Sequence, residues 1–104
     1  MDYIVVFCTV PDKESGLQIA NELVSQKIAA CVNIVPGITS IYTWNGQICN
    51  DQELLLIIKA KKTHYNEIED VIKKLHTYQV PEIIALSIVD GSKNYLQWII
   101  EVTK

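Results

Sequence analysis

A chain of 104 residues, 49% hydrophobic and 20% charged, is long enough to bury one hydrophobic core but not two. This composition excludes a disordered or fibrous protein. The net charge of −3 and the absence of arginine argue against a nucleic-acid partner or phosphoryl transfer. We therefore expect a single globular domain over residues 1–104.

The N-terminal segment and the cysteines indicate the compartment. Residues 1–7 are largely apolar but begin Met-Asp, without the positive segment or the length of a signal peptide. No apolar run reaches the roughly 20 residues that a membrane span requires. Cys8, Cys31 and Cys49 are odd in number and lack Cys-x-x-Cys spacing, which is typical of reduced thiols. We expect a cytoplasmic protein that does not contact the membrane.

The first third of the chain predicts a strand, a helix and a second strand. Residues 3–10 form a continuous β-branched and aromatic run, typical of a strand buried on both faces. Pro11 ends this run, and Asp12 is expected to cap a helix. The apolar side of that helix repeats at helical spacing, through Leu17, Ala20, Leu23, Val24 and Ile28. Residues 29–35 return to strand character and complete a β-α-β unit.

A long ribbon is expected in the middle of the chain. Pro36-Gly37 favours turns whose twist suits a two-residue hairpin poorly, whereas Asn45-Gly46 is the favoured type I′ pair. We therefore expect one long strand over residues 29–44, bent at Pro36-Gly37. The hairpin turn lies at Asn45-Gly46, and the returning strand covers residues 51–61.

The last third predicts a helix, a strand and a short final helix. Thr63 is expected to cap the first of these, with His64 at the surface and an apolar stripe of Ile68, Val71, Ile72 and Leu75. Residues 82–89 are typical of another buried strand. The final helix begins near Ser92 and directs inward Tyr95, Leu96 and Ile99.

The order β-α-β-β-α-β with a terminal helix predicts the fold class. This order is typical of an α+β, ferredoxin-like sandwich, here with an extended β-hairpin and a short C-terminal helix. Both main helices then cover one face of a four-stranded antiparallel sheet. The other face has no helix to cover it, and the ribbon is too long for the domain. Both features favour self-association into a closed ring.

Several segments together resemble one known family. They are residues 8–12 (Cys-Thr-Val-Pro-Asp), 29–33, 36–46, 53–59, 76–83 (His-Thr-Tyr-Gln-Val-Pro-Glu-Ile) and 95–99. In order and spacing they resemble the CutA divalent-cation-tolerance proteins over essentially the whole chain. The resemblance implies a ferredoxin-like homotrimer, similar to the PII signal-transduction proteins. It also implies a role in tolerance of, or binding to, copper and other divalent ions.

The resemblance further implies a metal site. The family's site, formed by a first-strand Cys and an adjacent His pair, would retain only Cys8 and His76, because Leu75 precedes that histidine. Thr77 also stands where the family commonly has Pro. A thiolate and an imidazole suit copper or zinc. Two ligands are fewer than a structural zinc site needs, so binding would be weak, solvent-accessible or shared between subunits.

Both proposed ligands also have purely structural explanations. Cys8 falls in an apolar strand, where a free cysteine behaves as a small buried hydrophobe. His76 ends a helix, where its side chain could cap a last-turn carbonyl group. Tyr78 and Glu82 supply further polar groups close to His76.

Aromatic and charged residues on the ribbon suggest a second kind of site. Tyr42 and Trp44 share a strand face, as a platform for a ligand or as packing across a subunit interface. Glu53 and Lys59 also share a face. With Glu82 they could line an intersubunit cleft, or they could form salt bridges or stay solvated. The expected ligand cleft or interface comprises Tyr42, Trp44, Glu53, Lys59, Tyr78 and Glu82.

Two functions follow from these residues. The first is a non-enzymatic homotrimer that binds copper or other divalent cations weakly and takes part in the response to metal ions. The alternative is a PII-like signalling trimer that holds a small molecule in intersubunit clefts. An enzyme is disfavoured, because acylphosphatases, which share the sandwich, rely on an arginine that this chain lacks.

Overall fold

The computed structural model describes residues 2–104. Its elements, in chain order, are β1 (Tyr3–Val10), α1 (Lys13–Ser25), β2 (Cys31–Trp44), β3 (Gln47–Lys61), a 3₁₀ turn η1 (Lys62–His64), α2 (Tyr65–Leu75), β4 (Ile84–Ser87) and α3 (Lys93–Val102). The predicted order of strands and helices is confirmed.

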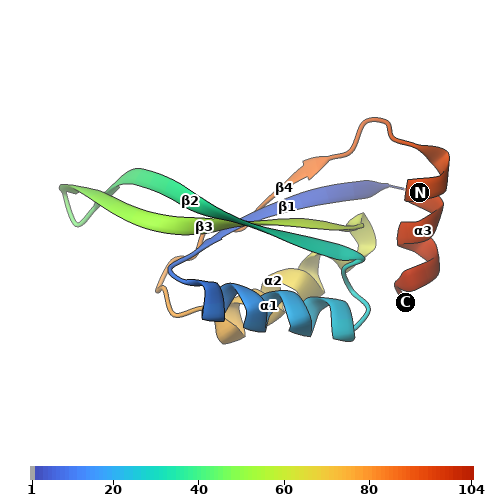
Figure 1. Cartoon of the computed structure of the whole chain (residues 1–104), viewed down its shortest axis with the longest axis horizontal. Coiled ribbons are helices and arrows are strands. Elements are labelled where there is room, and N and C mark those ends of the chain that lie inside the picture. The colour runs from blue at the N-terminus through green and yellow to red at the C-terminus, as the bar shows by residue number, and fades with distance from the viewer. Residues whose placement is uncertain (1) are drawn as a thin grey trace.

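The four strands form one antiparallel sheet in the order β2-β3-β1-β4. Helices α1 and α2 contact each other and lie against the same face of this sheet (Figure 1). Helix α3 lies at the end of the sheet far from the hairpin (Figure 1). The prediction of an α+β, ferredoxin-like fold is thus confirmed. Helix α3 contacts β3 at its far end, and we call the rest of the face opposite α1 and α2 the helix-free face.

The bend and the hairpin turn lie where the sequence predicts them. The β2–β3 register shifts by one residue between Val35 and Ile38, across Pro36 and Gly37. Gly37 has a φ of 78°, a conformation that favours glycine. At the turn, Asn45 and Gly46 have φ angles of 51° and 75°. Positive φ at both central residues is the requirement of a type I′ turn.

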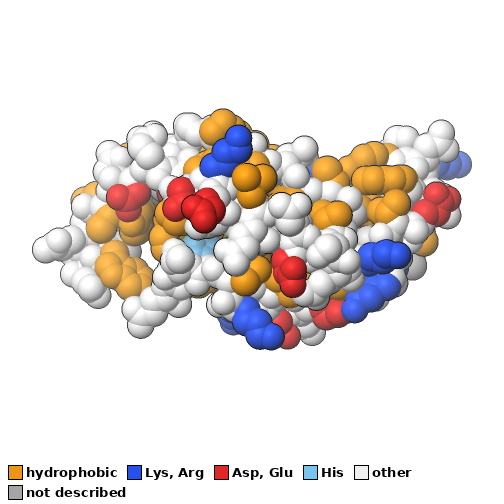
Figure 2. All heavy atoms as spheres, turned by 60° about the horizontal axis from the view of Figure 1, so that its bottom comes forward, with side chains coloured by type: hydrophobic (Ala, Val, Ile, Leu, Met, Phe, Trp, Pro, Cys, Tyr) orange, Lys and Arg blue, Asp and Glu red, His pale blue; other side chains and the backbone are white. Residues whose placement is uncertain are grey.

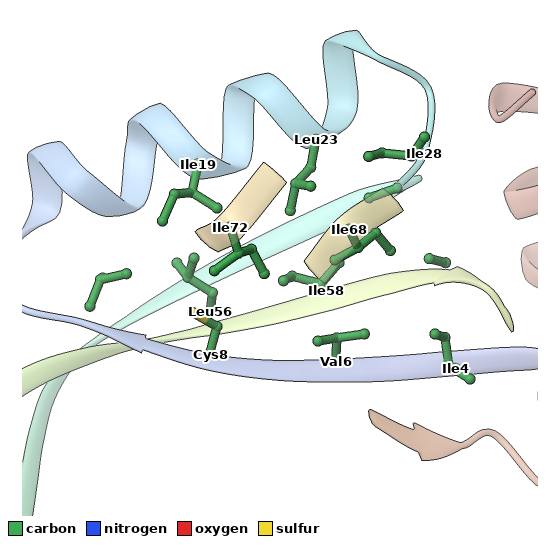
Figure 3. Close-up of a cluster of buried hydrophobic side chains, with 13 residues drawn as sticks. Ile4, Val6, Cys8, Ile19, Leu23, Ile28, Leu56, Ile58, Ile68 and Ile72 are labelled. Carbon is green, nitrogen blue, oxygen red and sulfur yellow. The ribbon is translucent and has the colours of Figure 1, made fainter. Parts of the chain in front are cut away.

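The core lies between the sheet and the two helices (Figure 3). Alternation in β1 and β3 directs one set of side chains towards the helices: Ile4, Val6, Cys8, Leu56, Ile58 and Ala60. They meet Ile19 and Leu23 of α1 and Ile68 and Ile72 of α2. The prediction for α1 was partly wrong, because Leu17 and Val24 are exposed and the buried stripe consists of Gly16, Ile19 and Leu23.

The start of α2 differs from the prediction. Residues 62–64 form the 3₁₀ turn η1, and α2 then begins at Tyr65 without a side-chain cap. Thr63 is therefore not the helix cap. His64 is buried, with only 7% of its surface exposed, so its predicted surface position was also wrong. The histidine lies near Lys104 instead of facing solvent.

The last strand and helix are more exposed than predicted. Strand β4 covers only residues 84–87, and all four are exposed. It lies at the edge of the sheet, beside β1, and has no strand on its other side among residues 2–104. In α3, Ile99 is buried as expected, but Tyr95 is exposed and packs against Trp98 at 5.5 Å between ring centroids.

The molecule is elongated because the β2–β3 hairpin extends beyond the body (Figure 1). Its extents are 44 × 25 × 22 Å. None of the helices in residues 2–104 is long and apolar enough to cross a membrane.

Candidate functional site

A groove lies between the hairpin and the segment that follows α2. Its volume is about 730 Å³, and it is lined by Thr9, residues 40–44, Glu53 and residues 78–82. In the half of the molecule nearer the hairpin, acidic and hydrophobic side chains and a histidine gather at the surface (Figure 2). Five of the six residues predicted for a ligand cleft or interface line this groove: Tyr42, Trp44, Glu53, Tyr78 and Glu82.

The bulge in β2 explains why the aromatic residues share a face with Glu53. Before the bulge, odd-numbered residues of β2 pair with odd-numbered residues of β3, whereas after it Ile38 pairs with Glu53 and Tyr42 with Cys49. Because directly paired residues lie on the same face, Tyr42 and Trp44 join Glu53. The Tyr42 hydroxyl donates to the Asp51 carboxylate, which raises the pKa of Tyr42 to about 12.

Glu53 is a buried carboxylate, with 6% of its surface exposed. The Tyr78 hydroxyl donates to its Oε2 atom at 2.7 Å. Burial first, and then this bond, raise the pKa of Tyr78. The ion pairs within residues 2–104 are Lys73–Glu69 and Lys104–Glu67, so Glu53 is held by a phenol and has no cationic partner there.

Replacing Tyr78 with Phe is expected to lower the free energy of unfolding by about 1–2 kcal/mol, because Oε2 of buried Glu53 then loses its donor. Urea denaturation at fixed protein concentration measures this loss. The matched control is Tyr42→Phe, which removes the same hydroxyl from a solvent-exposed carboxylate and should cost less. Equal losses in the two variants would show that the burial of Glu53 does not matter.

Cys8 is fully buried in the core, next to Leu56 (Figure 3). Its thiol lies 3.7 Å from the Thr9 carbonyl oxygen. Burial, followed by the negative charges of Glu82 and Glu53, raises the pKa of the Cys8 thiol to about 12. Cys8 is therefore a protonated thiol at neutral pH. It packs as the small hydrophobe that the structural explanation described.

His76 follows α2 directly, and both of its ring nitrogens are engaged. Nδ1 accepts a hydrogen bond from the backbone N–H of Tyr78 at 3.1 Å, so Nε2 carries the proton and donates to the Thr9 carbonyl oxygen at 2.7 Å. The ring does not bond a last-turn carbonyl of α2, as the capping explanation required. The Cys8 thiol points at the same Thr9 oxygen, so the fold brings the two proposed ligands together.

Lys59 lies outside the groove. Its ammonium donates to the Asn33 side chain and, at 3.4 Å, to the Ile57 carbonyl oxygen. It shares the helix-free face with Glu53, as alternation along β3 predicts. Two groups were missed from sequence: the Thr9 carbonyl, which no side-chain pattern marks, and Asp51. The hairpin register, which places Asp51 diagonally across from Tyr42, could have identified the latter.

As it stands, a single chain offers no preformed metal site. Residues 2–104 contain no group of three or more His, Cys, Asp or Glu side chains placed to hold one ion. The Cys8 thiol is protonated, and His76 has no free ring nitrogen. Ligation by these two residues would require a proton to leave and a hydrogen bond to break.

Comparison with known proteins gives a consistent result over the whole chain. The family model described as "CutA1 divalent ion tolerance protein" matches residues 4–102. The divalent-cation tolerance protein CutA of Thermus thermophilus is 50% identical over 99 residues, which cover 95% of this chain and 96% of that protein. The protein named "CutA, chloroplastic" of Arabidopsis thaliana is 48% identical, and the match covers 97% of this chain but 56% of that protein.

The solved structures agree. The crystal structure of CutA1 from Oryza sativa superposes with a TM-score of 0.97 at 46% identity, over 100% of this chain and 95% of that one.

Proposed function

This chain belongs to the CutA1 family of divalent ion tolerance proteins, and we propose that it takes part in the tolerance of divalent cations, copper among them. The match of residues 4–102 to a family described by that function carries the proposal. In this proposal the protein binds the ions weakly and catalyses no reaction. The absence of arginine removes the phosphate-orienting group on which an acylphosphatase-like reaction would depend.

Cys8 and His76 are the proposed metal ligands, with Tyr78 and Glu82 beside them. The Cys8 thiol and the His76 ring both contact the Thr9 carbonyl oxygen, which supports their assignment to one site. The cost of freeing both residues supports weak binding, since the thiol must lose its proton and His76 must leave Thr9 or Tyr78. Glu82, whose negative charge raises the pKa of Cys8, is near enough to favour a bound cation.

The affinity for Zn²⁺ is expected to rise with pH, by up to about tenfold per pH unit, because ligation releases the thiol proton. Calorimetric titration with Zn²⁺ and Cu²⁺ between about pH 6.5 and 8 measures it. A Cys8→Ala, His76→Ala double variant should lose binding, whereas Cys49→Ala, which removes a thiol from the hairpin, should not. Binding that is unchanged in the double variant would contradict the proposed ligands.

The proposed assembly is a homotrimer. Supporting it, the helix-free face carries exposed apolar side chains from β4, Ile84 and Leu86. The hairpin exposes Ile41, Tyr42, Trp44 and Ile48. A monomeric domain of this size rarely leaves so many large apolar side chains in water. In a closed ring, each hairpin would cover part of a neighbouring subunit.

The proposed location is the cytoplasm. The three cysteines are all free thiols, two of them partly accessible, which suits a reducing compartment. The PII-like alternative would place a small molecule in the groove between subunits. The relatives reported above are named for cation tolerance or simply as CutA, and none is named for signalling, so we do not adopt it.

A further inference from the structure

His64 is a buried histidine whose ring is not fully satisfied. It lies in η1 with 7% of its surface exposed, and its Nδ1 atom has no hydrogen-bond partner within the described residues 2–104. A buried polar atom without a partner carries a desolvation cost, and such atoms are uncommon enough in folded proteins to require an explanation. Neither the proposed metal ligands nor the groove involves this side chain.

The chain's last two described residues, Thr103 and Lys104, form what we call the latch, and Lys104 lies next to His64. The Thr103 hydroxyl donates to the Ile99 carbonyl of α3 at 2.6 Å. The Lys104 backbone N–H donates to the Lys27 carbonyl at 2.9 Å. Lys61 of β3 is buried, and its ammonium donates to the Lys104 backbone oxygen at 2.7 Å. The latch thus ties the end of α3 to β3 and to the loop after α1.

The charged groups around His64 are mostly positive. Lys61 of β3 and Lys104 of the latch face it, whereas the Glu67 carboxylate in the first turn of α2 and a hydrogen bond to the Lys104 backbone favour the charged ring. Glu67 is already paired with the Lys104 ammonium at 2.9 Å. A positive charge on the His64 ring would therefore be buried beside two cations, with one shared carboxylate and one backbone hydrogen bond to offset it, and burial with the Lys61 charge outweighs them.

From this arrangement we infer that His64 is an acid-sensitive release for the latch: when its ring is protonated, the Thr103–Lys104 segment and the end of α3 detach from the sheet. Detachment hydrates the charged ring and separates it from Lys104. It also removes the acceptor of Lys61 and exposes Ile99, which is fully buried when α3 is docked. Acid would thus expose the apolar side of α3 and the end of the sheet that α3 covers at neutral pH.

The pH range follows from the sign of the shift. Burial, and then the charge of Lys61, lower the pKa of His64 below its ordinary value of 6.5. The detached form therefore binds the proton more tightly than the docked form does. The stability of the docked latch is complete above about pH 6.5 and falls as the pH decreases from there towards the lowered pKa.

Hydrogen exchange with mass-spectrometric detection tests this on the intact protein at about pH 7.5 and pH 5, corrected for intrinsic rates. Protection of the peptide spanning α3 and the latch is expected to fall at the lower pH, by up to about tenfold for each pKa unit of the shift. A His64→Asn variant should lose this pH dependence. The chain has one other histidine, His76, and His76→Asn is the matched control. This variant should retain the pH dependence of protection.

A titration of the wild-type chain by NMR gives a second readout if His64→Asn does not fold. The amide signals of Thr103 and Lys104 are expected to move with the same midpoint as the His64 ring, below pH 6.5. The inference is overturned if these amides do not follow His64, or if His64→Asn keeps the pH-dependent loss of protection.

Discussion

An Ile84→Asp variant is expected to sediment as a single folded subunit, whereas the wild-type chain is expected to sediment as the proposed trimer. Ile84 of β4 pairs with Phe7 of β1 on the helix-free face, and 51% of its surface is exposed in a single chain. A single chain can therefore accept aspartate at this position. A subunit interface over the same face would bury one unpaired carboxylate per subunit, at a cost of several kcal/mol each.

The matched control is Leu17→Asp, which makes the same change in charge on the outer side of α1. Leu17 is 43% exposed and lies on the helical side of the sheet. This variant should keep the sedimentation coefficient of the wild type, and circular dichroism should show that both variants are folded. If Ile84→Asp also remains a trimer, the helix-free face near β4 is not part of the interface.

A Leu56→Ala variant is expected to lose about 3 kcal/mol of unfolding free energy. Leu56 is fully buried between Cys8 of β1 and the two helices (Figure 3), where a cavity cannot collapse without moving the sheet. The loss should appear as a lower urea midpoint at a fixed subunit concentration, since assembly also contributes to stability.

Val89→Ala is the control for the Leu56 measurement. Val89 is 97% exposed and follows β4, outside any helix or strand. Its truncation should leave the urea midpoint almost unchanged. Similar losses in the two variants would mean that the side chains assigned to the core do not carry the stability of the fold.

The parts of the fold that the sequence predicts well depend on local chemistry. Asp12 caps α1 through a bond of 2.8 Å from the Ser15 backbone N–H, which also lowers the pKa of Asp12. Asn45 and Gly46 adopt the positive φ angles that their turn needs. The helix cap and the turn each involve residues within three positions of each other. The local sequence is therefore enough to predict both.

The features that were missed depend on residues far apart in the chain. His64 is buried and lies next to Lys104, forty residues later, and nothing near His64 in sequence shows this. The bond from Tyr78 to Glu53 joins residues separated by 25 positions, and it exists because residues 78–82 pass beside the hairpin. Strand β4 contains apolar residues like a buried strand, but its place at the sheet edge is a property of the whole topology.

We propose that this chain covers its helix-free face by closing into a ring of three. Sedimentation equilibrium of the wild-type chain at low micromolar concentration tests it most directly. The expected particle has three times the chain mass of 11.8 kDa, and its mass is unchanged on dilution. A well-folded species with the mass of one chain would contradict it.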